Sequence, residues 1–172
     1  IAWRLELGVK IRCADRCLSV FSRMSEISDR IAAIHERMNA ACTRAGRDAA
    51  SVDLLAVSKT FPAEAIREAF EAGQLLFGEN KVQEVLAKAP ELPSKLRWHL
   101  IGHLQSNKVR KILPLVDVVH SVDSLDLARD IQRIGGELGL FPKVYLEVNL
   151  AAECTKHGFK PAELREGGLE AL

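Results

Sequence analysis

The sequence lacks an excess of charge of either sign, and it lacks any long apolar run. Its 172 residues include 24 lysines and arginines against 23 aspartates and glutamates, which gives a net charge of +1. Contact with a nucleic-acid backbone needs a basic stripe that this balance does not supply. A membrane-spanning helix needs about 18 consecutive apolar residues, and the sequence has no such run. We therefore expect neither nucleic acid nor a membrane as a partner.

Cysteine is also scarce, and its spacing indicates no disulfide framework. The four residues are Cys13, Cys17, Cys42 and Cys154. Only Cys13 and Cys17 could share one helical face, whereas a zinc site needs three or four ligands. The sequence shows no secretory signal. We therefore interpret the cysteines as reduced thiols in a cytoplasmic protein, and we expect no metal.

Aromatic residues make up only 5% of the chain, although 48% of its residues are hydrophobic. A core of valine, isoleucine, leucine and alanine is typical of α/β domains. Apolar runs of strand length alternate with amphipathic stretches of helical period. The predicted strands are 52–58, 75–78, 98–102, 116–120 and 144–150. Ser25 and Ser124 are predicted to cap helices, and Gly46 and Gly73 to end them.

This alternation predicts right-handed crossovers and a parallel sheet. The chain after Met24 holds about five βα units. A closed (β/α)8 TIM barrel needs eight units and typically about 250 residues. The sequence therefore predicts either an incomplete barrel, with unpaired edges near 52–58 and 144–150, or an open doubly wound sheet.

The first 23 residues differ from the rest of the chain. They carry five basic and two acidic residues and show no helical or strand period. We expect residues 1–23 to be a leader or upstream extension outside the fold, with Met24 as the natural start. Residues 24–172 are then expected to form one partial barrel domain.

Polar residues gather where the predicted strands end. In chain order these residues are Lys59, Asn80, His103, Asp123, Asn149, Lys156 and His157. Because the carboxyl ends of parallel strands share one face, where ligand sites lie, we expect these groups to line one mouth.

Lys59 is the most informative of these residues, because it ends an apolar run where a buried strand should meet a loop. Partial burial would lower the pKa of its amine and favour a Schiff base with a carbonyl compound. The alternative is an ordinary solvated loop charge. For Asn80 and Asn107 the alternative role is helix capping.

The histidines have simpler interpretations. His99 could be a hydrogen-bonded imidazole of the core. The spacing of His103, His120 and His157 is not typical of metal binding, so they are interpreted as polar lining.

Four motifs at the strand ends carry a family resemblance. They are AVSKT at 56–60, FGENKVQE at 77–84, WHLIGHLQSNK at 98–108 and KHGF at 156–159. Taken in order, they closely resemble the pyridoxal phosphate homeostasis proteins, also called the YggS or PROSC family. The likeness runs from about Met24 to Phe159.

The resemblance implies a barrel like the N-terminal domain of alanine racemase, with pyridoxal 5′-phosphate held as a Schiff base on Lys59. It implies a role in intracellular homeostasis of this cofactor, as a carrier or buffer without a dedicated catalytic activity. The residues that it places around the cofactor are Lys59, Asn80, Ile101, Gly102, His103 and Asn149, the last near the ring.

The sequence departs from the family pattern in small ways. Leu100 stands where an aromatic residue is common, and Cys154 and Thr155 precede Lys156 where serine is usual. The family's phosphate-binding segment would lie beyond Leu172, so we expect weak cofactor binding by this chain.

Two alternatives to cofactor binding stay open. One is a Schiff-base, aldolase-like barrel enzyme that acts without a cofactor. The other is an inert fragment. A monomer is expected for the complete family, whereas edge-to-edge association is possible for this chain.

Overall fold

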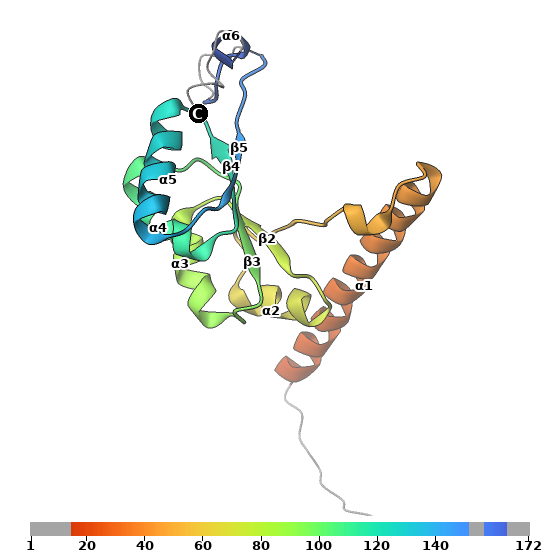
Figure 1. Cartoon of the computed structure of the whole chain (residues 1–172). Helices are drawn as coiled ribbons and strands as arrows, with labels where there is room; N and C mark the ends of the chain where they lie inside the picture. The colour runs from red at the N-terminus through yellow and green to blue at the C-terminus, as the bar shows by residue number, and fades with distance from the viewer. Residues whose placement is uncertain (1–14, 152–156, 165–172) are drawn as a thin grey trace, which may run out of the picture.

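The computed structural model describes residues 15–151 and 157–164. Five parallel strands form one sheet in the order β1-β2-β3-β4-β5 (Figure 1). Their bounds are β1 Ala56–Val57, β2 Leu76–Glu79, β3 Arg97–Leu100, β4 Val118–Val122 and β5 Lys143–Leu146. Beyond β5, Val148 and Phe159 form an isolated parallel bridge.

The strand order decides between the two predicted architectures. Each strand pairs in parallel with the next one along the chain, so that Phe77 lies opposite Trp98 and Leu100 opposite Val119. A doubly wound sheet reverses its order at a switch point, whereas a barrel adds every strand on the same side. The described sheet is therefore part of a barrel, and the prediction of an incomplete (β/α)8 barrel is confirmed.

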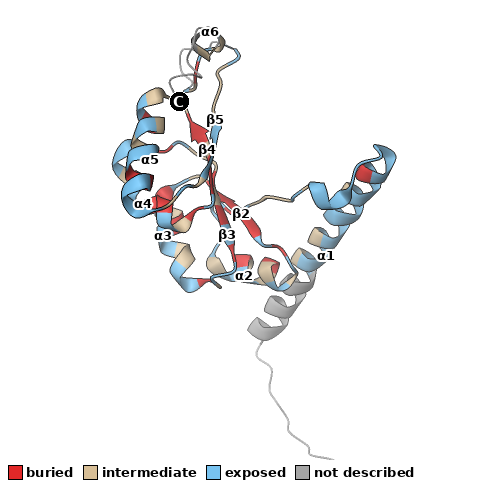
Figure 2. Ribbon diagram, viewed as in Figure 1, coloured by how far each residue is buried: buried red, intermediate tan, exposed pale blue. Residues whose placement is uncertain are grey.

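The helices between residues 63 and 138 cover one face of this sheet, whereas the long N-terminal helix lies apart from it and contacts the helix at 63–71 (Figures 1 and 2). The α-helices are α1 Asp15–Arg44, α2 Ala63–Glu71, α3 Val82–Lys88, α4 Val109–Ile112, α5 Leu125–Leu138 and α6 Pro161–Glu163. Short 3-10 turns are η1 Ala49–Ser51, η2 Ala89–Glu91, η3 Ser106–Lys108 and η4 Leu113–Leu115.

The hydrophobic core lies between the sheet and the helices α2 to α5. Trp98 and Leu100 of β3 point into it and meet helical residues such as Val85 and Ile112, all of them buried. Because neighbouring strand residues point to opposite faces, His99 lies on the other side of the sheet, which is the inner side of the partial barrel.

Helix α1 is longer than predicted. It begins at Asp15 and passes through Ser25 without a break, so the prediction that Ser25 caps a helix is wrong. The reason is that no glycine or proline interrupts residues 15–44. The predicted leader therefore includes helical residues at 15–23, and its first 14 residues lie outside the described part of the chain.

Three other helix ends follow the predictions. The Ser124 hydroxyl accepts the Leu127 N–H at 3.4 Å and caps α5. Gly46 and Gly73 have φ angles of 60° and 93°, just beyond α1 and α2. The capping alternative for Asn80 is wrong, since Lys81 is the residue that precedes α3.

Strand β1 is shorter than the predicted 52–58 and pairs only with β2 among the described strands. Instead of a second strand, the side chain of Gln74 donates hydrogen bonds to the carbonyls of Leu54 at 2.7 Å and Leu76 at 2.6 Å. These hydrogen bonds take the place of the hydrogen bonds between strands for the residues before Ala56. At the other edge, β5 exposes Val144 and Tyr145.

No described helix combines the length and the apolarity that crossing a membrane would require.

Candidate functional site

The carboxyl ends of the strands carry the predicted site residues. Lys59 follows β1, Asn80 follows β2, and Ile101, Gly102 and His103 follow β3. Asn149 lies beyond β5, where its N–H donates to the carbonyl of Phe159 at 2.9 Å. Lys156 lies outside the described residues. The expectation that these loops share one end of the sheet agrees with the fold.

Lys59 itself is exposed, so the prediction of a partly buried amine is wrong. The reason is its place at the end of β1, an edge of the described sheet that has a neighbour on one side only. Within the described part of the chain, the Lys59 amine has no hydrogen bond or ion pair. Its nitrogen is therefore available to a ligand.

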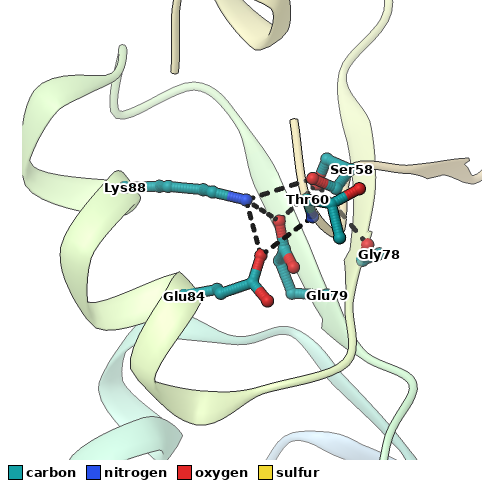
Figure 3. A network of polar contacts seen from close by, with 6 residues as sticks. All are labelled: Ser58, Thr60, Gly78, Glu79, Glu84 and Lys88. Carbon is teal, nitrogen blue, oxygen red and sulfur yellow. Dashed lines mark hydrogen bonds and ion pairs between the residues drawn. The ribbon is translucent and has the colours of Figure 1, made fainter. Parts of the chain in front are cut away.

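The backbone around Lys59 is held by a buried ion pair. Glu79 is fully buried, and its Oε1 accepts a hydrogen bond from the Lys88 amine at 2.7 Å and from the Ser58 hydroxyl at 2.8 Å (Figure 3). The Lys88 amine also donates to the Ser58 carbonyl at 3.1 Å. Glu79 therefore ties the residue before Lys59 to helix α3.

Glu84 holds the backbone on the other side of Lys59, at Thr60. Its Oε2 accepts from Lys88 at 2.9 Å and from the Thr60 N–H at 3.2 Å (Figure 3). Thr60 has a φ of 68°, a conformation that a residue with a branched side chain rarely adopts. The Lys59 turn is thus anchored on both sides, at Ser58 and at Thr60.

The charges in this cluster stabilise one another. The hydrogen bond from Lys88 is the main cause that lowers the pKa of Glu84, followed by the Thr60 N–H. Burial alone would lower the pKa of Lys88, but the hydrogen bonds and charges of Glu79 and Glu84 outweigh it and raise that pKa. Lys88 is therefore a charged structural lysine, whereas the Lys59 amine is not part of this cluster.

The loops after β2 and β3 approach each other closely. A Cβ atom on Gly102 would lie only 2.2 Å from the Asn80 carbonyl oxygen, so this position requires glycine. The Ile101 N–H donates to the Glu79 carbonyl at 2.9 Å, which extends the pairing of the two strands. The structure thus brings Asn80, Ile101 and Gly102 together.

His103 contacts a different group of residues. Its Nδ1 lies 3.0 Å from Oδ2 of Asp123, which follows β4. His157 approaches the same carboxylate, with its Nδ1 3.7 Å from the same oxygen. The two imidazole rings stack with their centroids 4.4 Å apart.

Two further histidines lie on the inner face of the sheet. Nδ1 of His99 is 3.0 Å from Nε2 of His120, and the ring of His120 contacts Tyr145. Burial lowers the pKa of His99, as does the charge of His120. Burial also lowers the pKa of His120. The predicted hydrogen bond of His99 is confirmed, but its place in the core is not, because the half-buried ring lies on the inner face of the sheet and outside the hydrophobic core.

Sequence reasoning missed the roles of Glu84, Lys88 and Asp123. Glu84 and Lys88 are four residues apart on α3, a spacing that favours an ion pair on a helix. The sequence therefore contained a signal for the ion pair between Glu84 and Lys88. It contained no signal that Glu79 would be buried beside that pair. Asp123 was recognised only as a polar residue after a strand.

These features define the class of the protein, a parallel α/β barrel domain with a free lysine at the end of its first strand. The family model for the alanine racemase N-terminal domain matches residues 30–171, and the chain therefore belongs to that family. The fold and the family predicted from the sequence motifs are thus confirmed.

Curated relatives are named pyridoxal phosphate homeostasis protein. The protein of Pseudomonas aeruginosa is 48% identical over 145 residues, which cover 82% of this chain and 62% of the relative. That of Aquifex aeolicus is 42% identical over 139 residues, covering 80% and 61%. The chain therefore spans about three fifths of the length of these relatives.

Solved structures agree with this assignment. PipY of Synechococcus elongatus, whose structure has been solved with pyridoxal phosphate bound, is 47% identical with a TM-score of 0.70. The match covers 84% of this chain and 63% of PipY. Alanine racemase of Clostridium difficile is 16% identical with a TM-score of 0.58, covering 70% and 32%, and shares the fold.

Proposed function

We propose that this chain binds pyridoxal 5′-phosphate through a Schiff base on Lys59 and serves intracellular homeostasis of that cofactor. The observation that carries the proposal is the Lys59 amine, which is exposed and unpaired among the described residues while its backbone is anchored on both sides. The bound form of PipY and the names of the relatives support the choice of ligand.

The described residues fit the aldehyde end of the cofactor. Gly102 lies close against Asn80 and has no side chain. Backbone, and not a side chain, therefore borders the carboxyl end of the sheet at this position. A neutral Lys59 nitrogen can form a carbon–nitrogen double bond with the aldehyde carbon, and one water molecule leaves. Asn80, Ile101, Gly102, His103 and Asn149 are proposed to line the site around this bond.

The buried cluster positions Lys59 without taking part in bonding to the cofactor. Glu79, Glu84 and Lys88 fix Ser58 and Thr60, so the lysine side chain leaves the sheet from a defined point. A Schiff base then forms with less loss of backbone entropy than on a mobile loop. This arrangement supports a carrier, which needs a reversible covalent bond and a fixed anchor.

The test is to map the reactive lysine. The chain is incubated with pyridoxal 5′-phosphate, reduced with borohydride and digested, and the pyridoxyl-lysine is located by mass spectrometry. We expect the label on the peptide that contains Lys59, with a stoichiometry near one. Lys59→Ala should lose at least about nine tenths of the label, because the nucleophile is gone.

Lys95→Ala is the matched control. Lys95 is also exposed but precedes β3, at the opposite end of the sheet, so its removal should leave the labelling unchanged. Circular dichroism checks that each variant is folded. A label spread evenly over exposed lysines, or one that persists in Lys59→Ala, would refute the proposal. Trapping of a carbonyl substrate without the cofactor would favour the aldolase-like alternative.

A cytoplasmic location and a capacity for edge-to-edge association belong to the same proposal. The cysteines support the location, since Cys42 is a buried free thiol. The exposed residues of β5 support the association. Fractionation of cells that express the protein would test the location.

A further inference from the structure

Three side chains that commonly bind metals meet at the carboxyl end of the sheet, although they are far apart in the sequence. His103 follows β3, Asp123 follows β4, and His157 lies beyond β5. The ligand atoms of the three residues lie within 4.8 Å of one another. We propose that His103, Asp123 and His157 form a site for a divalent transition metal, with Zn²⁺ as the best match.

The spacing of the ligand atoms suits a tetrahedral ion. Zn²⁺ lies about 2.0–2.1 Å from imidazole nitrogen and about 2.0–2.2 Å from carboxylate oxygen, so two ligands of one ion are roughly 3.3–3.5 Å apart. The Asp123 oxygen is 3.0 Å from Nδ1 of His103 and 3.7 Å from Nδ1 of His157. Small rotations of two exposed imidazoles would bring both distances into range.

The backbone holds His103 and Asp123 next to each other. The Ser121 hydroxyl of β4 donates to the Gly102 carbonyl at 2.6 Å, which fastens the loop after β3 to the neighbouring strand. His103 is the residue after Gly102, and Asp123 lies two residues after Ser121. The first two ligands are therefore placed by the sheet itself.

A separate contact places His157. The Phe159 N–H donates to the Glu147 carbonyl at 2.8 Å, and the Phe159 carbonyl accepts from Asn149 at 2.9 Å. Gly158 between them has a φ of 115°, and a Cβ there would lie 2.9 Å from the Glu147 carbonyl oxygen. Glycine thus allows the segment to lie close against the extension of β5, with His157 turned towards Asp123.

The three side chains differ in exposure, and this difference suits a metal ion with one coordination position left for water. The Asp123 side chain is only 9% exposed, whereas those of His103 and His157 are 45% and 66% exposed. A buried carboxylate supplies negative charge, and the exposed imidazoles leave room for water as a fourth ligand. Two imidazoles with one carboxylate favour Zn²⁺ over Mg²⁺ or Ca²⁺, which prefer oxygen ligands.

Metal binding must displace hydrogen from the ligand nitrogens. With a neutral His103, its Nδ1–H donates to Asp123, so binding requires the tautomer that carries the hydrogen on Nε2. If either imidazole is protonated, one proton is released to solvent for each ring that binds. Affinity should therefore fall with falling pH, because protons compete with the metal for the ligand atoms.

The test is titration of the metal-free chain with Co²⁺, which reports its coordination through visible absorption bands, followed by competition with Zn²⁺. We expect one Co²⁺ per chain with tetrahedral bands that Zn²⁺ abolishes. His157→Ala and Asp123→Asn should each weaken binding by more than about tenfold. Zn²⁺ should also slow amide hydrogen exchange at 157–160, because it ties this segment to two other loops.

Asp126→Asn and His35→Ala are matched controls, since both residues are exposed and outside the cluster. A variant with all four cysteines replaced by serine excludes thiolate ligands, and its spectrum should match that of the original chain. Absence of tetrahedral bands at equimolar Co²⁺, or equal binding by the Asp123→Asn and Asp126→Asn variants, would overturn the inference. Lys59→Ala should bind Co²⁺ normally, because Lys59 is not one of the three ligands, so a failure of metal binding can be distinguished from a failure of cofactor labelling.

Discussion

At the scale of single residues, His99 and His120 form a pair whose protonation opposes folding. Their nitrogens lie 3.0 Å apart on the inner face of the sheet, and the pKa of each is lowered by burial. The unfolded chain therefore binds more protons than the folded chain just below pH 6.5, the usual value for histidine. This contribution to stability is complete above that value and is lost as the pH falls through the folded pKa values.

We predict that His120→Gln makes the free energy of unfolding less dependent on pH below 6.5. The variant removes one of the two titrating groups and the charge that acts on His99. Denaturant titrations on either side of that pH measure the change. Tyr145→Phe keeps the ring beside His120 and both imidazoles, and should keep the original dependence. Equal pH dependence of the His120→Gln variant and the unchanged chain would contradict the prediction.

At the scale of secondary structure, the main connection is between the end of β1 and helix α3. Lys88 neutralises Glu79, which is fully buried, and its removal would leave that carboxylate without a counter-charge. Helix α3 therefore does more than cover the sheet, since it sets the position of the Lys59 turn. The sequence signals of α3 predicted its existence but not this role.

We predict that Lys88→Met destabilises the fold by about 3 to 5 kcal/mol, the usual cost of breaking a buried ion pair by removing one partner. The double variant Lys88→Met with Glu79→Gln should recover part of this loss, because the buried charge is gone. Lys81→Met changes an exposed lysine next to the same helix and should stay within about 0.5 kcal/mol. Denaturant unfolding measures all three.

The pH dependence of the same cluster gives a second measurement. The pKa of Glu84 is lowered from 4.5 in the folded chain. The contribution of Glu84 to the free energy of unfolding is therefore complete above pH 4.5 and is lost as the pH falls through the pKa of the folded state. The pKa of Lys88 is raised from 10.5 in the folded chain. The contribution of Lys88 to the free energy of unfolding is therefore complete below pH 10.5 and is lost as the pH rises through the pKa of the folded state. A loss of stability for Lys88→Met that is equally large at pH 3 would contradict this account.

At the scale of the whole molecule, the described sheet has two open edges. β5 exposes Val144 and Tyr145, and the neighbouring Phe141 is 81% exposed. An apolar groove of about 380 Å³ runs beside this strand, between α5 and residues 140–146. Unpaired backbone beside apolar side chains favours pairing with another chain.

We predict that the chain associates with a second copy through β5, and that Val144→Lys shifts it towards the monomer. A charge on an edge strand opposes pairing because it would be buried in the new interface. Sedimentation over a range of concentrations measures the shift. Leu86→Lys places the same charge on an exposed position of α3 and should not change the association. A chain that stays monomeric at every concentration would refute the prediction.

The sequence by itself determined the alternation of strands and helices, because the periods of 2 and 3.6 residues are local properties of the chain. It determined the capping of α5 by Ser124, and its four motifs pointed to the family to which the relatives belong. Residues such as Lys59 were identified because they end apolar runs.

Only the tertiary structure decided which residues meet. The order of the strands, and so the choice of a barrel over a doubly wound sheet, depends on pairing between segments some 20 residues apart. The same pairing exposed Lys59 at an edge and buried Glu79 under Lys88. It also brought His103 and His157 to one carboxylate, which no spacing along the chain predicts, because parallel strands align their ends regardless of the distance in sequence.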